Sequence, residues 1–200
     1  MIYENSDIPF YLLSSSPRRI ELLKSVGINF NVIEPFGEDI EFKFKSPRYY
    51  VEKKALNKMT ETLSRLGLKK GAFLTADTIV VRKRKIYEKP VDEETAIKTL
   101  KTLEGKWHTV FTAYCLTIPE KNIQVLKSLR TQVKFKVMKE KEILNYVATK
   151  EPLDKAGAYA LQGYGLFMIE RIEGSFTNVI GLPLTEVIND LLKYGVIKPR

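Results

Sequence analysis

The chain of 200 residues has few of the residue types on which several common functions depend. It contains one cysteine, one histidine and one tryptophan. A single cysteine excludes an internal disulfide and favours a reducing cytosol, and a single histidine argues against a multi-histidine metal centre. No stretch reaches the roughly 18 uninterrupted apolar residues of a membrane-spanning helix. The first ten residues lack the basic region of a secretory signal, so we expect a cytoplasmic protein with no membrane partner.

Positive charge is what the sequence has in excess. Thirty-three Lys and Arg residues against 24 Asp and Glu give a formal net charge of +9. The 44% hydrophobic and 28% charged residues are the balance of a folded globular chain, either one domain or two small lobes sharing a core. Surplus cations indicate a polyanionic partner, which composition leaves open among nucleic acid, nucleotide and anionic lipid.

Short strands and helices alternate along the whole chain. The apolar spacing predicts helices over residues 47–66 and 183–192, and strands over 72–81, 110–118, 124–137 and 166–172. We see no repeat, low-complexity tract or linker that divides the chain. The sequence therefore predicts the α/β class with a mixed sheet that any two lobes would share.

Two arginines stand at the start of the first predicted helix. Ser16 and Pro17 are ordinary helix-start residues, but Arg18 and Arg19 follow in the first turn. Cations there oppose the helix dipole at a cost of about 0.3–1 kcal/mol each. A bound phosphate would reverse this penalty, because backbone N–H groups and both guanidinium groups would contact it. The alternative is a solvated basic patch.

An aspartate interrupts the most apolar predicted strand. Asp77 is costly to bury unless it is paired, bound to a metal ion or used in catalysis. It is suited to bind a divalent ion or to take a proton from water, and the structural alternative is a salt bridge across the sheet. Farther along, glycines and polar side chains mix between Asp154 and Gly163, which favours close approach of the backbone to a ligand. We expect His108 and Cys115 to be structural.

Five motifs occur in one order across nearly the whole chain: SSSPRR, ADT, EKP, EPLDKAGAYALQG and GSFTNVIGLPL. Together they resemble the Maf family of nucleoside triphosphate pyrophosphatases. The resemblance implies a single domain over residues 1–200, with two lobes that share a twisted mixed sheet flanked by helices, similar to the inosine triphosphate pyrophosphatases. It also implies an active site in the cleft between the lobes, and hydrolysis of a nucleoside triphosphate to the monophosphate and pyrophosphate.

The resemblance assigns Asp77 as the proton acceptor. A further family lysine follows the Tyr-Val of a Pro-x-x-Tyr-Val segment by several residues; it matches Lys58, and Lys54 fits less well. The phosphate-binding residues that the resemblance implies are therefore Ser14, Arg18, Arg19, Lys58 and Lys89. In this assignment part of the net positive charge converges on one triphosphate.

The resemblance also implies a divalent cation, Mg²⁺ or Mn²⁺, held by Asp77 and a second carboxylate. Such hard ions prefer oxygen ligands, consistent with the scarcity of histidine. The second carboxylate stays open among three residues: an ungapped count favours Asp39, whereas residue type favours Glu38 or Glu41.

Three positions separate branches of the family. The branch that acts on dTTP and UTP has arginine, threonine and glutamine where this chain has Arg18, Thr78 and Gln162, and the 7-methyl-GTP branch differs at all three. The resemblance therefore implies hydrolysis of dTTP, UTP or a modified pyrimidine nucleotide that the cell removes from its pool. It also implies a homodimer.

The competing interpretation is a nucleic-acid-binding or septum-associated regulatory protein without hydrolysis. It would use the net charge and the basic segment 82–85. A run of charges at a hairpin tip is usually a solvated turn, and no RNA-binding aromatic motif or zinc-finger spacing accompanies it. We therefore expect a nucleotide rather than a nucleic acid as the partner.

Overall fold

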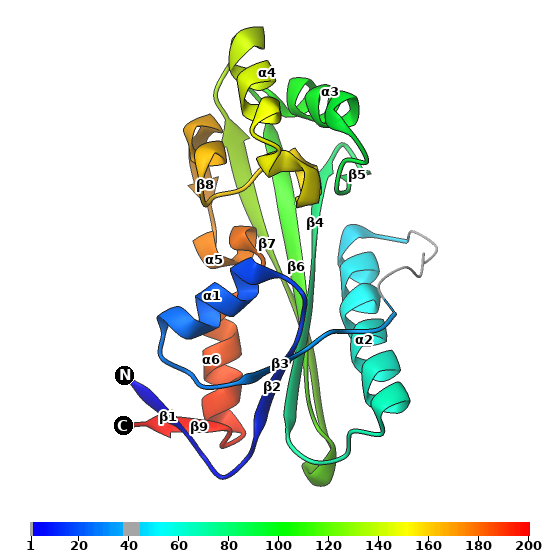
Figure 1. Cartoon of the computed structure of the whole chain (residues 1–200), viewed down its shortest axis with the longest axis vertical. Helices are drawn as coiled ribbons and strands as arrows, with labels where there is room; N and C mark the ends of the chain where they lie inside the picture. Colours follow the sequence, from blue (N-terminus) through cyan, green and yellow to red (C-terminus); the bar gives the residue numbers. More distant parts are fainter. Residues whose placement is uncertain (1, 38–44) are drawn as a thin grey trace. The chain divides into compact units, whose positions relative to one another are not determined.

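The computed structural model describes residues 2–37 and 45–200 (Figure 1). The helices in these ranges are α1 (Pro17–Ser25), α2 (Pro47–Leu66), α3 (Glu93–Leu103), α4 (Glu140–Ala148), α5 (Phe176–Ile180) and α6 (Leu184–Lys193). The strands are β1 (Tyr3–Asn5), β2 (Phe10–Leu13), β3 (Asn31–Ile33), β4 (Ala72–Arg82), β5 (Lys85–Tyr87), β6 (Trp107–Ile118), β7 (Ile123–Phe135), β8 (Ile169–Glu173) and β9 (Ile197–Pro199). The short 3₁₀ helices in the same ranges are η1 (Pro119–Lys121), η2 (Glu151–Asp154), η3 (Ala156–Ala158) and η4 (Tyr164–Met168).

The main sheet is mixed, as the alternation of strands and helices predicts. Its strand order is β3-β2-β4-β6-β7-β8, with β5 paired to β4. Strand β2 pairs in parallel with both β3 and β4, whereas β4–β5 and β7–β8 are antiparallel. The α/β class and the mixed sheet are therefore confirmed. In the described ranges, no helix is both long and apolar enough to cross a bilayer.

The chain divides into two compact units, which we describe separately. The first unit holds residues 1–77, 112–129 and 181–200, and the second holds 78–111 and 130–180. The division falls between Asp77 and Thr78 in the middle of β4, so the predicted site residues are distributed over both units.

In the first unit, helix α2 has the bounds that its sequence predicts. Ser46 caps its start by accepting a hydrogen bond from the Tyr49 backbone, and Gly67 ends it in the left-handed conformation. The helix packs against the sheet, where Met59 joins Leu13, Phe73 and Cys115 in a buried cluster. Burial raises the pKa of Cys115 to about 11, so this thiol is an inert core residue, as predicted.

Helix α6 is fixed to the first unit by a buried acid. Asp190, 3% exposed, accepts a hydrogen bond from the Tyr114 hydroxyl at 2.5 Å and pairs with Lys127 at 2.6 Å. Such a buried carboxylate is tolerated because both of its oxygens are satisfied by polar partners.

In the second unit, helices α3 and α4 pack together, and the single histidine lies in an aromatic cluster. His108 is 3% exposed, and its Nε2 lies 2.8 Å from the Tyr159 hydroxyl oxygen. The rings of Phe135 and Tyr159 meet the imidazole edge-on. Burial above all, with a further contribution from Arg82, lowers the pKa of His108 to about 3. The structural role that the sequence predicts for this residue is confirmed.

We expect the buried imidazole to make folding stability depend on acid. The pKa of His108 is about 3 when folded and about 6.5 when unfolded, so the unfolded chain binds the extra proton as pH falls below 6.5. Between pH 7 and pH 5 this removes about 2 kcal/mol of unfolding free energy. Urea unfolding of the wild type and His108→Gln at both pH values measures the difference. Equal losses in the two proteins would show that this titration is not coupled to folding.

Three local features differ from the sequence-based expectation. The predicted strand over 166–172 begins only at Ile169, because η4 occupies the residues before it. The terminal strands β1 and β9 pair with each other, which no periodicity in such short segments indicates. In the β4–β5 turn, Lys83 and Arg84 both have positive φ, a conformation that usually takes Asn or Gly.

Candidate active site

Three residues of two distant motifs meet in the first unit. Ser14, 2% exposed, follows β2, and its hydroxyl accepts a hydrogen bond from the Ser16 backbone at 3.2 Å. Arg19, 9% exposed, donates from Nη1 to this hydroxyl at 3.5 Å and from Nε to the Gly181 carbonyl at 2.8 Å. The motifs SSSPRR and GLPL are therefore joined through one buried guanidinium.

The start of α1 has a charge arrangement that suits an anion. Its first turn contains no acidic residue but carries Arg18 and Arg19, and the Ser16 side chain makes no capping hydrogen bond. Arg18 is half-buried, whereas Arg19 is held against the protein. Arg19 is therefore not part of a solvated basic patch, which was the alternative that the sequence left open.

Parallel pairing of β2 and β4 brings Ser14, just after the end of β2, close to the level of Asp77 in the middle of β4. In the register of β2 and β4, Leu12 lies opposite Leu74. Ser14 is two residues beyond this pair and Asp77 three, so both lie within about 10 Å of it along the strands at 3.3 Å per residue. Ser14 follows the carboxyl end of β2, and the carboxyl ends of parallel strands are where α/β sheets bind ligands.

The carboxylate of Asp77 is paired with a lysine from α2. Lys58 Nζ donates to Asp77 Oδ1 at 2.7 Å, and the two side chains are 7% and 16% exposed. The salt bridge that the sequence left open does form, but it joins a helix to the strand rather than two strands. Hydrogen bonding of Thr75 Oγ1 to the Ala55 carbonyl at 2.8 Å fixes α2 beside this part of β4.

The structure places Lys58 within hydrogen-bonding distance of Asp77. Lys58 is buried, whereas Lys54, one turn earlier on α2, is half-buried and lies with its ammonium over the Tyr50 ring at 5.8 Å. The two lysines stand four residues apart on the helix, and Lys58 donates to this carboxylate. The lysine that the motif spacing favours is therefore the one paired with Asp77 at hydrogen-bonding distance, and its role in phosphate binding stays a prediction.

The remaining predicted residues belong to the second unit. Thr78 is half-buried on β4, and Lys89 is exposed after β5. The Gly157 backbone donates to the Glu88 carbonyl at 3.3 Å, which places the EKP and DKAG motifs side by side. A Cβ at Gly157 would lie 2.8 Å from a Val80 methyl group, so this position requires glycine.

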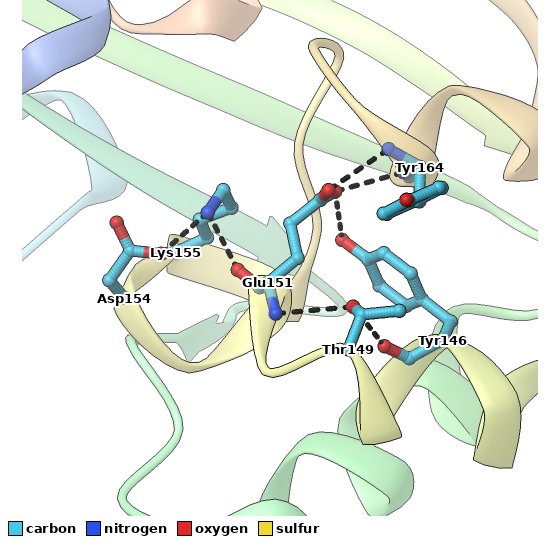
Figure 2. A network of polar contacts seen from close by, with 7 residues as sticks. Tyr146, Thr149, Glu151, Asp154, Lys155 and Tyr164 are labelled. Carbon is cyan, nitrogen blue, oxygen red and sulfur yellow. Dashed lines mark hydrogen bonds and ion pairs between the residues drawn. The ribbon is translucent and has the colours of Figure 1, made fainter.

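Gln162 has a buried side-chain oxygen. Its Oε1 makes no hydrogen bond within the described part of the chain, although the residue as a whole is half-buried. An amide oxygen in that situation costs free energy unless a ligand or water supplies a donor. Lys155, by contrast, is occupied locally: it donates to the Glu151 carbonyl at 2.6 Å and to Asp154 at 2.5 Å (Figure 2).

Sequence reasoning missed two residues that shape the loop around Gln162. The Glu151 carboxylate accepts hydrogen bonds from the loop backbone and from the Tyr146 hydroxyl, as Figure 2 shows. Glu151 is the first residue of the motif EPLDKAGAYALQG. The two glycines after Gln162 could have indicated this contact, because glycines allow another group to approach the backbone closely.

The donor set suits a cation that takes its other ligands from a substrate. Within residues 2–37 and 45–200, no cluster of three or more His, Cys, Asp or Glu side chains is placed to hold a metal ion. Asp77 could supply one carboxylate, since Mg²⁺ characteristically binds one or two carboxylates together with phosphate oxygens and water. The candidates for the second carboxylate, Glu38, Asp39 and Glu41, lie outside the described residues.

Comparisons with known proteins agree with this arrangement of motifs. The chain is 43% identical over 187 residues to a Geobacter sulfurreducens protein named dTTP/UTP pyrophosphatase, covering 93% of this chain and 96% of that protein. Proteins of the same name from Caldicellulosiruptor saccharolyticus and Thermosipho africanus are 44% and 42% identical, over 92% and 93% of this chain and 94% and 93% of their own lengths. The family model of the Maf-like proteins matches residues 9–194. The chain therefore belongs to the Maf-like protein family.

Proposed function

We propose that this protein is a nucleoside triphosphate pyrophosphatase that hydrolyses dTTP and UTP. The observation that carries the proposal is the match, over more than nine-tenths of the chain, to relatives that bear the name dTTP/UTP pyrophosphatase. In the reaction, a water oxygen bonds to phosphorus, a phosphoanhydride P–O bond breaks, and the products are the nucleoside monophosphate and pyrophosphate.

Asp77 is the proposed catalytic carboxylate. Lys58 Nζ donates to Asp77 Oδ1 at 2.7 Å and so holds the carboxylate in place. The Asp77 side chain is slightly exposed, which leaves it accessible to a small molecule such as water. A positioned carboxylate can orient the attacking water and accept its proton. The buried ammonium of Lys58 would also stabilise the negative charge that develops on the substrate phosphates in the transition state.

The cations of SSSPRR are the proposed triphosphate-binding groups of the first unit. Arg19 is pre-ordered by the Gly181 carbonyl and the Ser14 hydroxyl, so little side-chain entropy remains to be lost on binding. Arg18 lies in the same first turn with greater exposure. Guanidinium groups at a helix start can bind phosphate together with the backbone N–H groups. In the second unit, Lys89 is exposed and is the proposed further phosphate-binding cation.

A divalent cation, Mg²⁺ or Mn²⁺, completes the proposal. Asp77 would hold it together with substrate phosphate oxygens and one carboxylate of the segment 38–41. When bound, such an ion neutralises phosphate charge and acidifies water. We also propose, from the family resemblance and the single cysteine, a cytoplasmic homodimer.

Gln162 is the proposed reader of the base. Its buried Oε1 suits the N–H donor of a uracil or thymine ring, and its amide nitrogen suits a ring carbonyl. Cytosine presents its N3 acceptor at the ring position where uracil and thymine have N–H, so in the same pose it would lose this hydrogen bond. Thr78 and Arg18 are the other two proposed specificity positions.

A panel of nucleotides tests the proposal. With Mg²⁺, we expect pyrophosphate release from dTTP and UTP to exceed that from CTP, GTP and 7-methyl-GTP by at least about tenfold in kcat/KM. Chelation of the cation is expected to abolish turnover, and Mg²⁺ or Mn²⁺ to restore it.

The same preparation discriminates the nucleic-acid alternative. Binding to duplex and single-stranded DNA is measured at two salt concentrations, because phosphate contacts weaken steeply with salt. DNA binding without hydrolysis of any nucleotide would overturn the proposed activity. The β4–β5 turn carries the basic run in a tight hairpin in which Lys83, Arg84 and Lys85 are exposed, which is the geometry of a solvated turn.

A further inference from the structure

The Glu151 carboxylate and the Tyr146 hydroxyl form hydrogen bonds at the loop that carries Gln162 (Figure 2). Glu151 Oε2 accepts from the Tyr164 backbone at 2.9 Å, and Oε1 accepts from the Gly165 backbone at 2.9 Å. The Tyr146 hydroxyl donates to the same Oε1 at 3.0 Å. One carboxylate therefore fixes the backbone two and three residues after Gln162.

The hydroxyl of Tyr146 holds the other side of the loop. The backbone N–H of Ala160, two residues before Gln162, lowers its pKa, and the Ala160 backbone and the Tyr146 hydroxyl lie on either side of the space beside Gly165. Burial and the nearby Glu151 carboxylate raise the pKa of Tyr146, so its hydroxyl stays protonated at neutral pH. Tyr146 lies beside the backbone before Gln162, and Glu151 binds the backbone after it. We call these two residues the clamp.

The glycines of the motif fit this clamp. A Cβ at Gly163 would collide with Glu151 Oε2, and one at Gly165 would lie 2.8 Å from the Tyr146 hydroxyl oxygen. Gly163 also has a φ of 86°, which disfavours any side chain. The loop can approach the clamp this closely only because both positions lack a side chain.

The clamp is itself anchored. The Glu151 backbone N–H donates to Thr149 Oγ1 at 3.2 Å, and its carbonyl accepts from Lys155 at 2.6 Å. The Tyr146 ring, 3% exposed as a residue, lies edge-on to Phe167 with ring centroids 6.1 Å apart. Both clamp side chains therefore start from fixed backbone and ring positions.

We propose that Tyr146 and Glu151 are positioning residues for substrate specificity, which hold the Gln162 amide where it reads a pyrimidine base. The inference rests on the proposed function, because it assumes that Gln162 contacts the base. Neither clamp residue touches the phosphates in this account. Their loss should therefore weaken base discrimination and leave the chemical step largely intact.

Tyr146→Phe is the test, because it removes one hydroxyl and keeps the ring. We expect kcat/KM for dTTP and UTP to fall about tenfold, mainly through KM, while the rates with CTP and GTP stay near wild type. The loss should disappear in a Gln162→Ala background, because the clamp acts through that residue. The matched control is Tyr114→Phe, which removes a buried hydroxyl from the first unit and should leave the nucleotide preference unchanged.

A second variant and a second readout separate positioning from general destabilisation. In Glu151→Gln, one acceptor oxygen becomes an amide nitrogen, and we expect faster hydrogen exchange at the amides of Tyr164 and Gly165 together with the same loss of preference. A wild-type preference in both variants, or an equal loss for every nucleotide, would overturn the inference while leaving the proposed function standing. Absence of hydrolysis by the wild type would instead overturn the proposed function, and the inference with it.

Discussion

Asp77→Asn is expected to lower kcat for dTTP by about 10²- to 10⁴-fold, the range for loss of a general base. Asparagine keeps the size of the side chain and an oxygen for Lys58, whose Nζ lies 2.7 Å from Oδ1 in the wild type. It cannot accept the proton of the attacking water, and it is a weaker ligand for a divalent cation. Initial rates of pyrophosphate release, with folding checked by circular dichroism, measure the effect.

Asp190→Asn is the matched control for this substitution. Asp190 is also a buried acid of the first unit, and it is paired with Lys127 at 2.6 Å. Its replacement is expected to lower the free energy of unfolding, because Tyr114 and Lys127 lose a charged partner, while kcat stays near wild type. If Asp77→Asn kept near-normal turnover, the assignment of the catalytic carboxylate would be wrong.

The second large effect is expected at Lys58. In Lys58→Met, we predict a fall in kcat/KM of about 10²- to 10³-fold, because a buried positive charge beside the proposed catalytic carboxylate is lost. The unfolding free energy should also fall by about 1–3 kcal/mol, since the mostly buried Asp77 carboxylate loses its ion-pair partner. Steady-state kinetics and urea unfolding report the two effects independently.

Lys54→Met provides the comparison within the same helix. It removes the same charge one turn earlier on α2, from a half-buried side chain that lies over Tyr50. We expect its kcat/KM to stay within about threefold of wild type, because a half-exposed charge is screened by solvent. Equal losses in the two variants would indicate that general positive charge, rather than the Lys58–Asp77 pair, carries the effect.

Much of the fold could be predicted because its signals are local. The capped helix at Ser46, the apolar run of β4 and the α/β alternation each depend on a few neighbouring residues, and the structure reproduces them. Pairing of β1 with β9 could not be predicted, because it joins three-residue segments about 190 residues apart. The strand expected from residue 166 began late because the apolar run there forms η4.

In the candidate site, too, local features could be predicted from the sequence and contacts between distant residues could not. Burial of Asp77 in an apolar strand was a local signal for a partnered carboxylate, and Lys58 came from the motif spacing. That Arg19 binds the Gly181 carbonyl could not be derived, because the contact spans 162 residues. The Tyr146–Glu151 clamp was missed because its meaning depends on the path of the loop rather than on residue type.

Product analysis of dTTP hydrolysis by the wild-type protein is the most direct test of the central claim. In the presence of Mg²⁺, each molecule of dTTP consumed should yield one dTMP and one pyrophosphate, without orthophosphate, and UTP should give the corresponding products. Formation of dTDP and orthophosphate, or no turnover of either nucleotide, would contradict the account.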